Sequence, residues 1–156
     1  MLSSVPKIIS GGQTGADRAA LDLAIAFGME YGGFVPRHRL TEDGRLPSKY
    51  AGMTETVSAD NTERTELNVI NSDATLIVSN GELSGGSKLT KRFARKHKKP
   101  ILHLDLTLLT PESAADKARL WLTASKCETL NVAGPRASKD PTIYGDTLEL
   151  LKLIFG

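Results

Sequence analysis

The chain has 156 residues, about the length of one domain. With 40% apolar and 24% charged residues, its composition is typical of a folded globular protein and argues against extended disorder. A formal charge of +2 and only 5% aromatic residues disfavour a sequence-independent nucleic-acid binder. The single cysteine, Cys127, excludes an internal disulfide and a CxxC motif.

Short apolar runs alternate with helical patterns along the chain. Strands are predicted at residues 7–10, 31–36, 74–79, 100–106 and 129–133. Helices are predicted at residues 16–27, 63–71, 88–98, 111–125 and 144–155. This alternation indicates an α/β fold, with one doubly wound, Rossmann-like, mostly parallel sheet of about five or more strands and helices on both faces. We therefore expect a single domain over residues 1–156.

Residues 37–62 are polar, contain Gly44, Pro47 and Gly52, and have little periodicity. A stretch of this length without regular structure is usually functional. It leaves the second strand at the edge where ligands of doubly wound sheets bind. The segment is therefore predicted to be a mobile, irregular cover over the site, and Arg37, Arg39 and Lys49 give it positive charge suited to an anionic ligand.

A glycine-rich loop follows the first predicted strand. Glycines let the backbone approach an anion, and the free N–H groups of the next helix point at it. The candidate ligand-binding residues in this loop are Gly11, Gly12, Gln13, Thr14, Gly15 and Asp17. Ser10 replaces the first glycine of a GxGxxG fingerprint, and no acidic residue follows the second strand, so NAD is disfavoured. The loop is predicted to bind phosphate, and a tight turn that needs positive φ is the alternative.

Two further loops follow later strands. The second contains Ser84, Gly85, Gly86 and Ser87 and opens a helix, so these four residues are also candidates for binding the ligand. It lacks the GK[ST] of a Walker A motif. In the third loop, Arg136 either clamps an anion or is a solvated turn arginine, and both interpretations stay open.

Residues 91–99 include six Lys and Arg. We interpret this run as the end of a helix, where cations complement the helix dipole, rather than as a nucleic-acid site. The three histidines have no metal-type spacing, so no protein-ligated metal is expected. No apolar run is long enough to span a membrane, and the first ten residues do not have the pattern of a signal peptide. The expected location is cytoplasmic.

Residues 11–22, 64–87 and 130–144 together resemble the putative molybdenum carrier proteins, small bacterial Rossmann-like proteins related to the algal molybdenum-cofactor carrier. More distant relatives are the "lonely guy" cytokinin-nucleotide phosphoribohydrolases. The resemblance covers nearly the whole chain. It implies a small phosphorylated ligand of the pterin or nucleotide type, with the molybdenum cofactor as the candidate. It also implies a site role for Arg64 and a homo-oligomer, a dimer or tetramer.

The distant relatives carry an Arg eight residues before Ser-Asp-Ala, and later PGGxGTxxE. Arg64 stands eight residues before Ser72, which matches the first part. Lys88 and Leu89 replace the later Gly-Thr, and Arg92 takes the position of the catalytic Glu. A guanidinium cannot transfer a proton as a carboxylate does. We therefore assign no catalytic residue and expect a carrier that binds without chemistry.

Two alternatives stay open. One is a hydrolase that cleaves the N-glycosidic bond of nucleoside 5′-monophosphates, in which Glu82 would replace the missing carboxylate. The other is a regulatory nucleotide sensor without chemistry. Identification of the bound ligand separates the sensor from the carrier, and a turnover assay separates both from the hydrolase.

Overall fold

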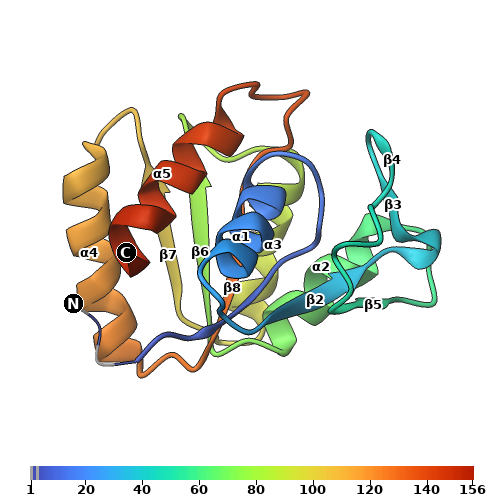
Figure 1. The fold of residues 1–156 in the computed structure, drawn as a ribbon, viewed down its shortest axis with the longest axis horizontal. Coiled ribbons are helices and arrows are strands. Elements are labelled where there is room, and N and C mark those ends of the chain that lie inside the picture. The colour runs from blue at the N-terminus through green and yellow to red at the C-terminus, as the bar shows by residue number, and fades with distance from the viewer. Residues whose placement is uncertain (1, 3) are drawn as a thin grey trace.

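The computed structural model describes residue 2 and residues 4–156, and its centre is a six-stranded parallel sheet (Figure 1). The strand order is β5-β2-β1-β8-β6-β7. The strands are β1 (Lys7–Ile9), β2 (Tyr31–Val35), β5 (Met53–Glu55), β6 (Ala74–Ser79), β7 (Ile101–Asp105) and β8 (Thr129–Ala133). The predicted α/β fold with a doubly wound parallel sheet is confirmed.

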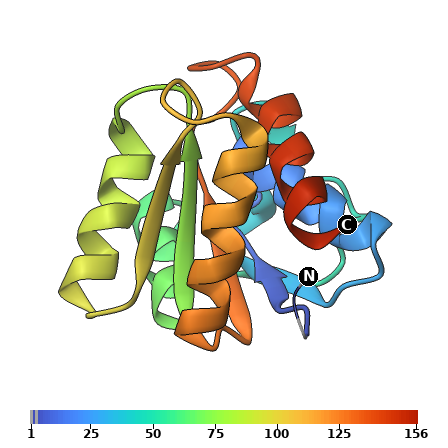
Figure 2. The ribbon, with the colours of Figure 1, turned by 90° about the vertical axis from the view of Figure 1, so that its left-hand side faces the viewer.

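Five helices cover the two faces of the sheet. They are α1 (Ala16–Ala26), α2 (Asn61–Ile70), α3 (Gly85–Lys96), α4 (Pro111–Ser125) and α5 (Ile143–Phe155). Helix α5 packs against α1 and α4, whereas α2 packs against α3. In Figure 2, α3 lies on one side of the sheet and α4 and α5 lie on the other. Both faces are therefore covered, as a parallel sheet requires.

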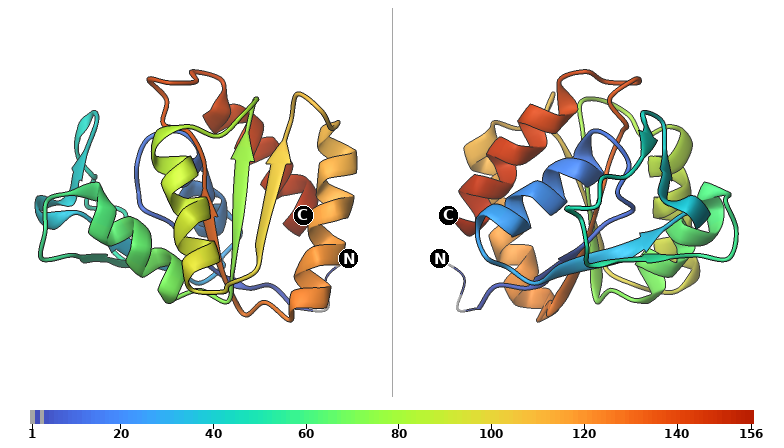
Figure 3. Two further views of the ribbon diagram at one scale, coloured as in Figure 1. Left: turned by 180° about the vertical axis from the view of Figure 1, so that it is seen from behind. Right: turned by 45° about the vertical axis from the view of Figure 1, so that its right-hand side comes forward.

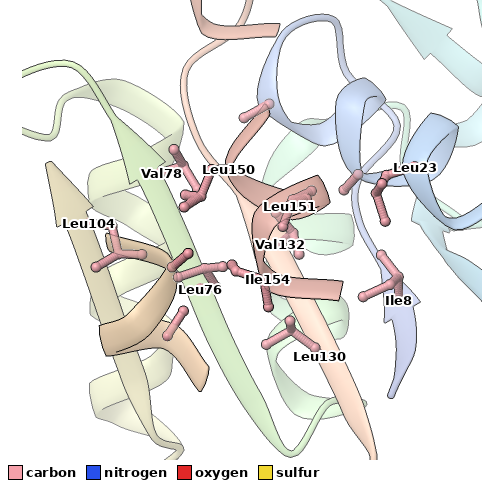
Figure 4. Packing of buried hydrophobic residues seen from close by; sticks show 14 of the residues in the cluster. Ile8, Leu23, Leu76, Val78, Leu104, Leu130, Val132, Leu150, Leu151 and Ile154 are labelled. Atoms are coloured by element: carbon pink, nitrogen blue, oxygen red, sulfur yellow. The ribbon is translucent and has the colours of Figure 1, made fainter. Parts of the chain in front are cut away.

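The main core lies between the sheet and the α1, α4 and α5 layer. All six residues of β6 are buried, because helices cover both of its faces. Figure 4 shows Leu76 of β6 and Leu130 of β8 close to Leu151 and Ile154 of α5. Alanines such as Ala20 let α1 approach the sheet closely. This packing fixes the loops that leave β1, β6 and β8.

The helices that follow the central strands lie on opposite faces of the sheet on the two sides of the β8–β6 boundary. Strands β1 and β8 lead into α1 and α5 on one face, and β6 leads into α3 on the other. Ligands of doubly wound sheets bind at such a point, beyond the carboxyl ends of the strands. The loops after β6 and β8 flank this point.

The prediction that residues 37–62 lack regular structure is wrong. They form a 3₁₀ turn, η1 (Arg37–Arg39), a hairpin of β3 (Leu40–Thr41) and β4 (Gly44–Arg45), and the edge strand β5. Figure 3 shows this segment beside the β2 edge of the sheet. Strands of two or three residues carry too little periodicity to be seen in the sequence.

Arg39 anchors this segment, instead of facing a ligand. Its guanidinium is buried and donates hydrogen bonds to the carbonyls of Leu46 at 3.2 Å, Pro47 at 2.9 Å and Tyr50 at 3.0 Å. The side chains of Leu46 and Tyr50 are also buried, in a small core with Val35. The segment is therefore tied to the body of the protein at residues 39–50.

Candidate functional site

A pocket of about 300 Å³ opens at the carboxyl edge of the sheet, where β8 and β6 diverge. Its size is at the lower end of the range for small-molecule sites. Eight of the twelve predicted site residues line it: Gln13, Asp17, Arg64, Ser84, Gly85, Gly86, Ser87 and Arg136. Gly11, Gly12, Thr14 and Gly15 are not among its lining residues. The structure thus brings all three predicted loops, and Arg64, to one place.

The N-terminus of α3 opens into this pocket. Ser84 is the N-cap residue, and its side chain makes no capping hydrogen bond within the described residues. The first amides of a helix have no intrahelical partner. A Cβ on Gly86 would meet only open space, and a Cβ on Gly85 would lie 2.5 Å from Lys139 Nζ. An anion therefore has access to these amides, with an ammonium group beside them.

Three cations from two elements line the pocket with one carboxylate. Arg64 comes from α2, and Arg136 and Lys139 come from the loop after β8. Asp17 is the only Asp or Glu among the lining residues. The side chains thus carry two positive charges in excess when Asp17 is ionised, in addition to the positive end of α3. This balance suits a dianion such as a phosphomonoester.

The buried Asp17 and the partly buried Arg64 form an ion pair at one side of the pocket. Asp17 is 4% exposed, and its Oδ2 lies 3.6 Å from Arg64 Nη1 and accepts the Gln13 N–H at 3.3 Å. Burial raises the pKa of Asp17 to about 6, although the charge of Arg64 opposes this rise. Arg64 Nε is buried and has no hydrogen-bond partner in the described part of the chain.

The first loop uses most of its own amides. The N–H of Gly12 donates to Ser10 Oγ at 3.3 Å, that of Thr14 to Gln13 Oε1 at 3.1 Å, and that of Ala16 to the Pro135 carbonyl at 3.2 Å. Few donors are left for a phosphate. The prediction that this loop holds the phosphate stays a prediction, and the open amides lie on α3 instead.

The four predicted residues outside the pocket lining lie against neighbouring side chains and loops. A Cβ on Gly11 would collide with the guanidinium of Arg64, and one on Gly15 would collide with the Pro135 carbonyl. Gly12 and Gly15 have φ of +70° and +83°, a region that favours glycine. Thr14 Oγ1 accepts the Ala137 N–H at 3.1 Å. The first loop therefore packs closely against the loop after β8.

The hairpin of β3 and β4 also joins these two loops. The N–H of Glu42 donates to Gln13 Oε1 at 2.9 Å, and the Glu42 carboxylate accepts the Ser138 N–H at 3.2 Å. Gln13 lines the pocket, and Ser138 lies between Arg136 and Lys139 in the sequence. The tip of the hairpin thus helps to position the cations of the loop after β8.

Sequence reasoning missed several lining residues. Lys139 was visible as a second cation three positions after Arg136 in the same loop. The polar residues Asn61, Thr62 and Thr65 on the first turns of α2 also line the pocket. No local pattern indicated them, because β5 and the start of α2 were not recognised. Their position depends on the path of residues 53–61.

The carboxylate expected of a phosphoribohydrolase is not found in its place. Arg92 is exposed on α3, Glu82 is exposed in the preceding loop, and neither lines the pocket. Asp73 lies at the amino end of β6, where its carboxylate accepts the N–H groups of Glu128 and Thr129. That contact fixes the approach to β8 and lies far from the carboxyl edge.

No helix in residues 4–156 is long and apolar enough to cross a membrane. The same residues contain no group of three or more His, Cys, Asp and Glu side chains arranged to bind a metal ion.

Comparison with known proteins identifies the family. The model of the circularly permutated YpsA SLOG family matches residues 8–155. A crystal structure of a "putative molybdenum carrier protein" from Syntrophus aciditrophicus SB is 51% identical, with a TM-score of 0.96 over 97% of this chain and 96% of that chain. No curated protein matches. The predicted resemblance is confirmed, and the chain belongs to the circularly permutated YpsA SLOG family.

Proposed function

We propose that this protein binds a small phosphorylated ligand of the pterin or nucleotide class in the pocket between β6 and β8, without transforming it. The observation that carries the proposal is the convergence of Arg64, Arg136 and Lys139 on the open N-terminus of α3. Each of these groups attracts an anion, and together they exceed the single negative charge of Asp17. The ligand phosphate lies at Gly85 and Gly86, where no Cβ restricts its approach.

The molybdenum cofactor is the candidate ligand. A similar protein of known structure is named a putative molybdenum carrier. The residues fit this ligand, because its terminal phosphate suits the α3 end and the pocket offers no Cys or His as a metal ligand. The molybdenum would be held by the dithiolene of the cofactor itself. Asp17 and Gln13, on the β1 side of the pocket, would contact the organic part.

Native mass spectrometry of the purified protein, combined with molybdenum analysis, identifies the ligand that co-purifies. Calorimetry then tests the phosphate site with two matched pairs, GMP with guanosine and 6-hydroxymethylpterin phosphate with 6-hydroxymethylpterin. We expect at least one phosphorylated compound to bind at least tenfold more tightly than its unphosphorylated partner. Equal affinity within both pairs would contradict the proposal.

Gly86→Asp locates the phosphate. An aspartate in the first turn favours the helix dipole, so α3 stays folded while the new carboxylate repels a phosphate. We expect the affinity for the phosphorylated compound to fall at least tenfold in this variant, and to fall much less in the neutral control Gly86→Asn. If both variants bind as the wild type does, the phosphate does not lie at α3.

A further inference from the structure

An uncompensated row of cations lies on the outer side of α3. Lys88, Arg92, Arg95 and Lys98, here called the α3 stripe, are all exposed. The spacing of three to four residues places Lys88, Arg92 and Arg95 along one side of α3, and Lys98 follows two residues after the helix ends, so the row extends over about 15 Å. None of the four side chains makes an ion pair or hydrogen bond with another described residue.

The charges of the chain are separated along the sequence around this helix. Residues 88–99 contain seven Lys and Arg and no Asp or Glu, whereas the other residues contain 13 Lys and Arg and 18 Asp and Glu. The stripe region therefore carries +7 and the rest of the chain carries −5. Glu66 on α2 pairs only with Lys96 and His97. The α3 stripe keeps its full charge.

The helix dipole explains only one end of this arrangement. The sequence predicted a helix beginning at residue 88, but α3 begins at Gly85, so Lys88 lies in the first turn, near the positive end. A cation there is unfavourable, and the first turn of α3 has no acidic residue to offset it. Arg95 and Lys98 lie at the favourable end. Stabilisation of α3 therefore does not account for the whole stripe.

The stripe lies beside the pocket but outside it. Ser87, Leu89 and Thr90 of α3 line the pocket, whereas Lys88 and Arg92 do not. On its inner side α3 packs through Phe93 and Ala94. In the left view of Figure 3, α3 faces outward, with α2 beside it. The stripe thus forms an open surface that extends away from the pocket.

We propose that the α3 stripe is a docking surface for an acidic surface of a protein partner. Three unpaired cations on a helix, and a fourth just beyond its end, match a row of carboxylates, and the net negative charge of the remaining chain disfavours contact elsewhere. A ligand that fits the pocket is too small to cover a row of about 15 Å. No aromatic side chain is exposed on α3, so bases have no surface for stacking.

The test uses a labelled helical peptide with Glu at every third or fourth position, followed by fluorescence anisotropy at 50 and 150 mM salt. We expect the triple variant Lys88→Glu, Arg92→Glu, Arg95→Glu to bind the peptide at least 20-fold more weakly. The control variant Arg45→Glu, Lys117→Glu, Lys152→Glu has the same change in net charge on exposed cations elsewhere, and should lose less than threefold. Equal losses in the two variants would overturn the proposal.

Parallel measurements separate the other occupants. The same protein is also tested with a 20-nucleotide single-stranded RNA and with vesicles that contain 30% phosphatidylglycerol, at 150 mM salt. If either binds more tightly than the peptide, and the triple Glu variant loses this binding, the proposal is overturned. If the wild type self-associates and the triple Glu variant does not, the stripe binds a second copy of this chain, and the proposal of an acidic partner is overturned. The neutral variant Lys88→Gln, Arg92→Gln, Arg95→Gln should lose less affinity for the peptide than the triple Glu variant, but more than the control variant. Ligand binding in the pocket is measured separately, so this proposal and the proposed function fail independently.

Discussion

Arg64 Nη1 lies 3.6 Å from Asp17 Oδ2, although the two residues come from helices on opposite faces of the sheet. Helix α1 carries Asp17 and α2 carries Arg64, and the two side chains meet at the carboxyl edge of the sheet. Gly11 has no side chain, which leaves room for the guanidinium. The contact thus joins two of the pocket walls through an ion pair whose carboxylate is buried.

Asp17→Asn should change how stability depends on pH. Burial raises the pKa of Asp17 from 3.8 to about 6, so the protonated carboxyl contributes stability that is fully present below pH 3.8 and is lost as the pH rises through 6. Relative to Asp17→Asn, the wild type should lose roughly 2 kcal/mol between pH 4 and 7, since part of the effect is already lost at pH 4. Urea unfolding at several pH values measures this difference. The exposed Asp116→Asn is the control, and a pH-independent difference for Asp17→Asn would contradict the prediction.

Gly12→Ala should cost more stability than Gly28→Ala. Both glycines have positive φ, +70° and +65°, so alanine is strained at either position by about 1–2 kcal/mol. A Cβ on Gly12 would also lie 3.0 Å from Val35 Cγ1 and 3.1 Å from a Leu46 methyl carbon, whereas one on Gly28 meets nothing. We expect an additional cost of about 1–3 kcal/mol at Gly12 from overpacking. Denaturant unfolding of both variants measures this difference in the free energy of unfolding. Equal costs would show that Val35 and Leu46 shift to make room for the new methyl group.

Arg39→Ala should loosen residues 40–52. The variant loses three hydrogen bonds from a buried guanidinium to backbone carbonyls, with an expected destabilisation of about 2–3 kcal/mol. Hydrogen exchange should accelerate first at the amides of Leu46 and Tyr50, which pack in the small core. Arg37→Ala, which changes an exposed side chain, serves as the control. Unchanged exchange in Arg39→Ala would mean that the apolar contacts alone hold the segment.

Incubation with AMP or GMP should release no free base. Cleavage of the N-glycosidic bond needs a carboxylate near the anomeric carbon, and the one carboxylate that lines the pocket, Asp17, is paired with Arg64. Chromatography of the reaction mixture measures release of the base. Turnover that disappears in Glu82→Gln would show that this exposed loop residue reaches the ligand, and would overturn binding without chemistry.

Segments with a clear apolar period were predicted correctly as helices or strands. Residues 74–79, 111–125 and 129–133 form a strand, a helix and a strand as predicted, because burial on both faces or on one stripe leaves a clear apolar pattern. Loops after parallel strands share one edge, so the meeting of Ser84 and Arg136 with Gln13 followed from the topology.

Features that depend on long-range contacts were not predictable. The role of Arg39 as a buried anchor requires knowledge of which carbonyls surround it, and its charge alone suggested a ligand contact. Similarly, the amides of the glycine-rich first loop are occupied by Ser10, Gln13 and Pro135. Composition indicates where a backbone approaches a partner closely, but not whether that partner is a ligand or another loop.

The position of β8 has a consequence for synthesis on the ribosome. This late strand pairs with β1 through Ile8 and Leu130, and with β6 through Thr75 and Asn131. Until residues 129–133 leave the exit tunnel, a nascent chain has only two half-sheets, β5-β2-β1 and β6-β7, each with an open edge that β8 later covers. The pocket lies where β8 joins β6, so it forms only when this last strand is inserted. The two half-sheets must therefore be joined before the chain can bind a ligand in this pocket.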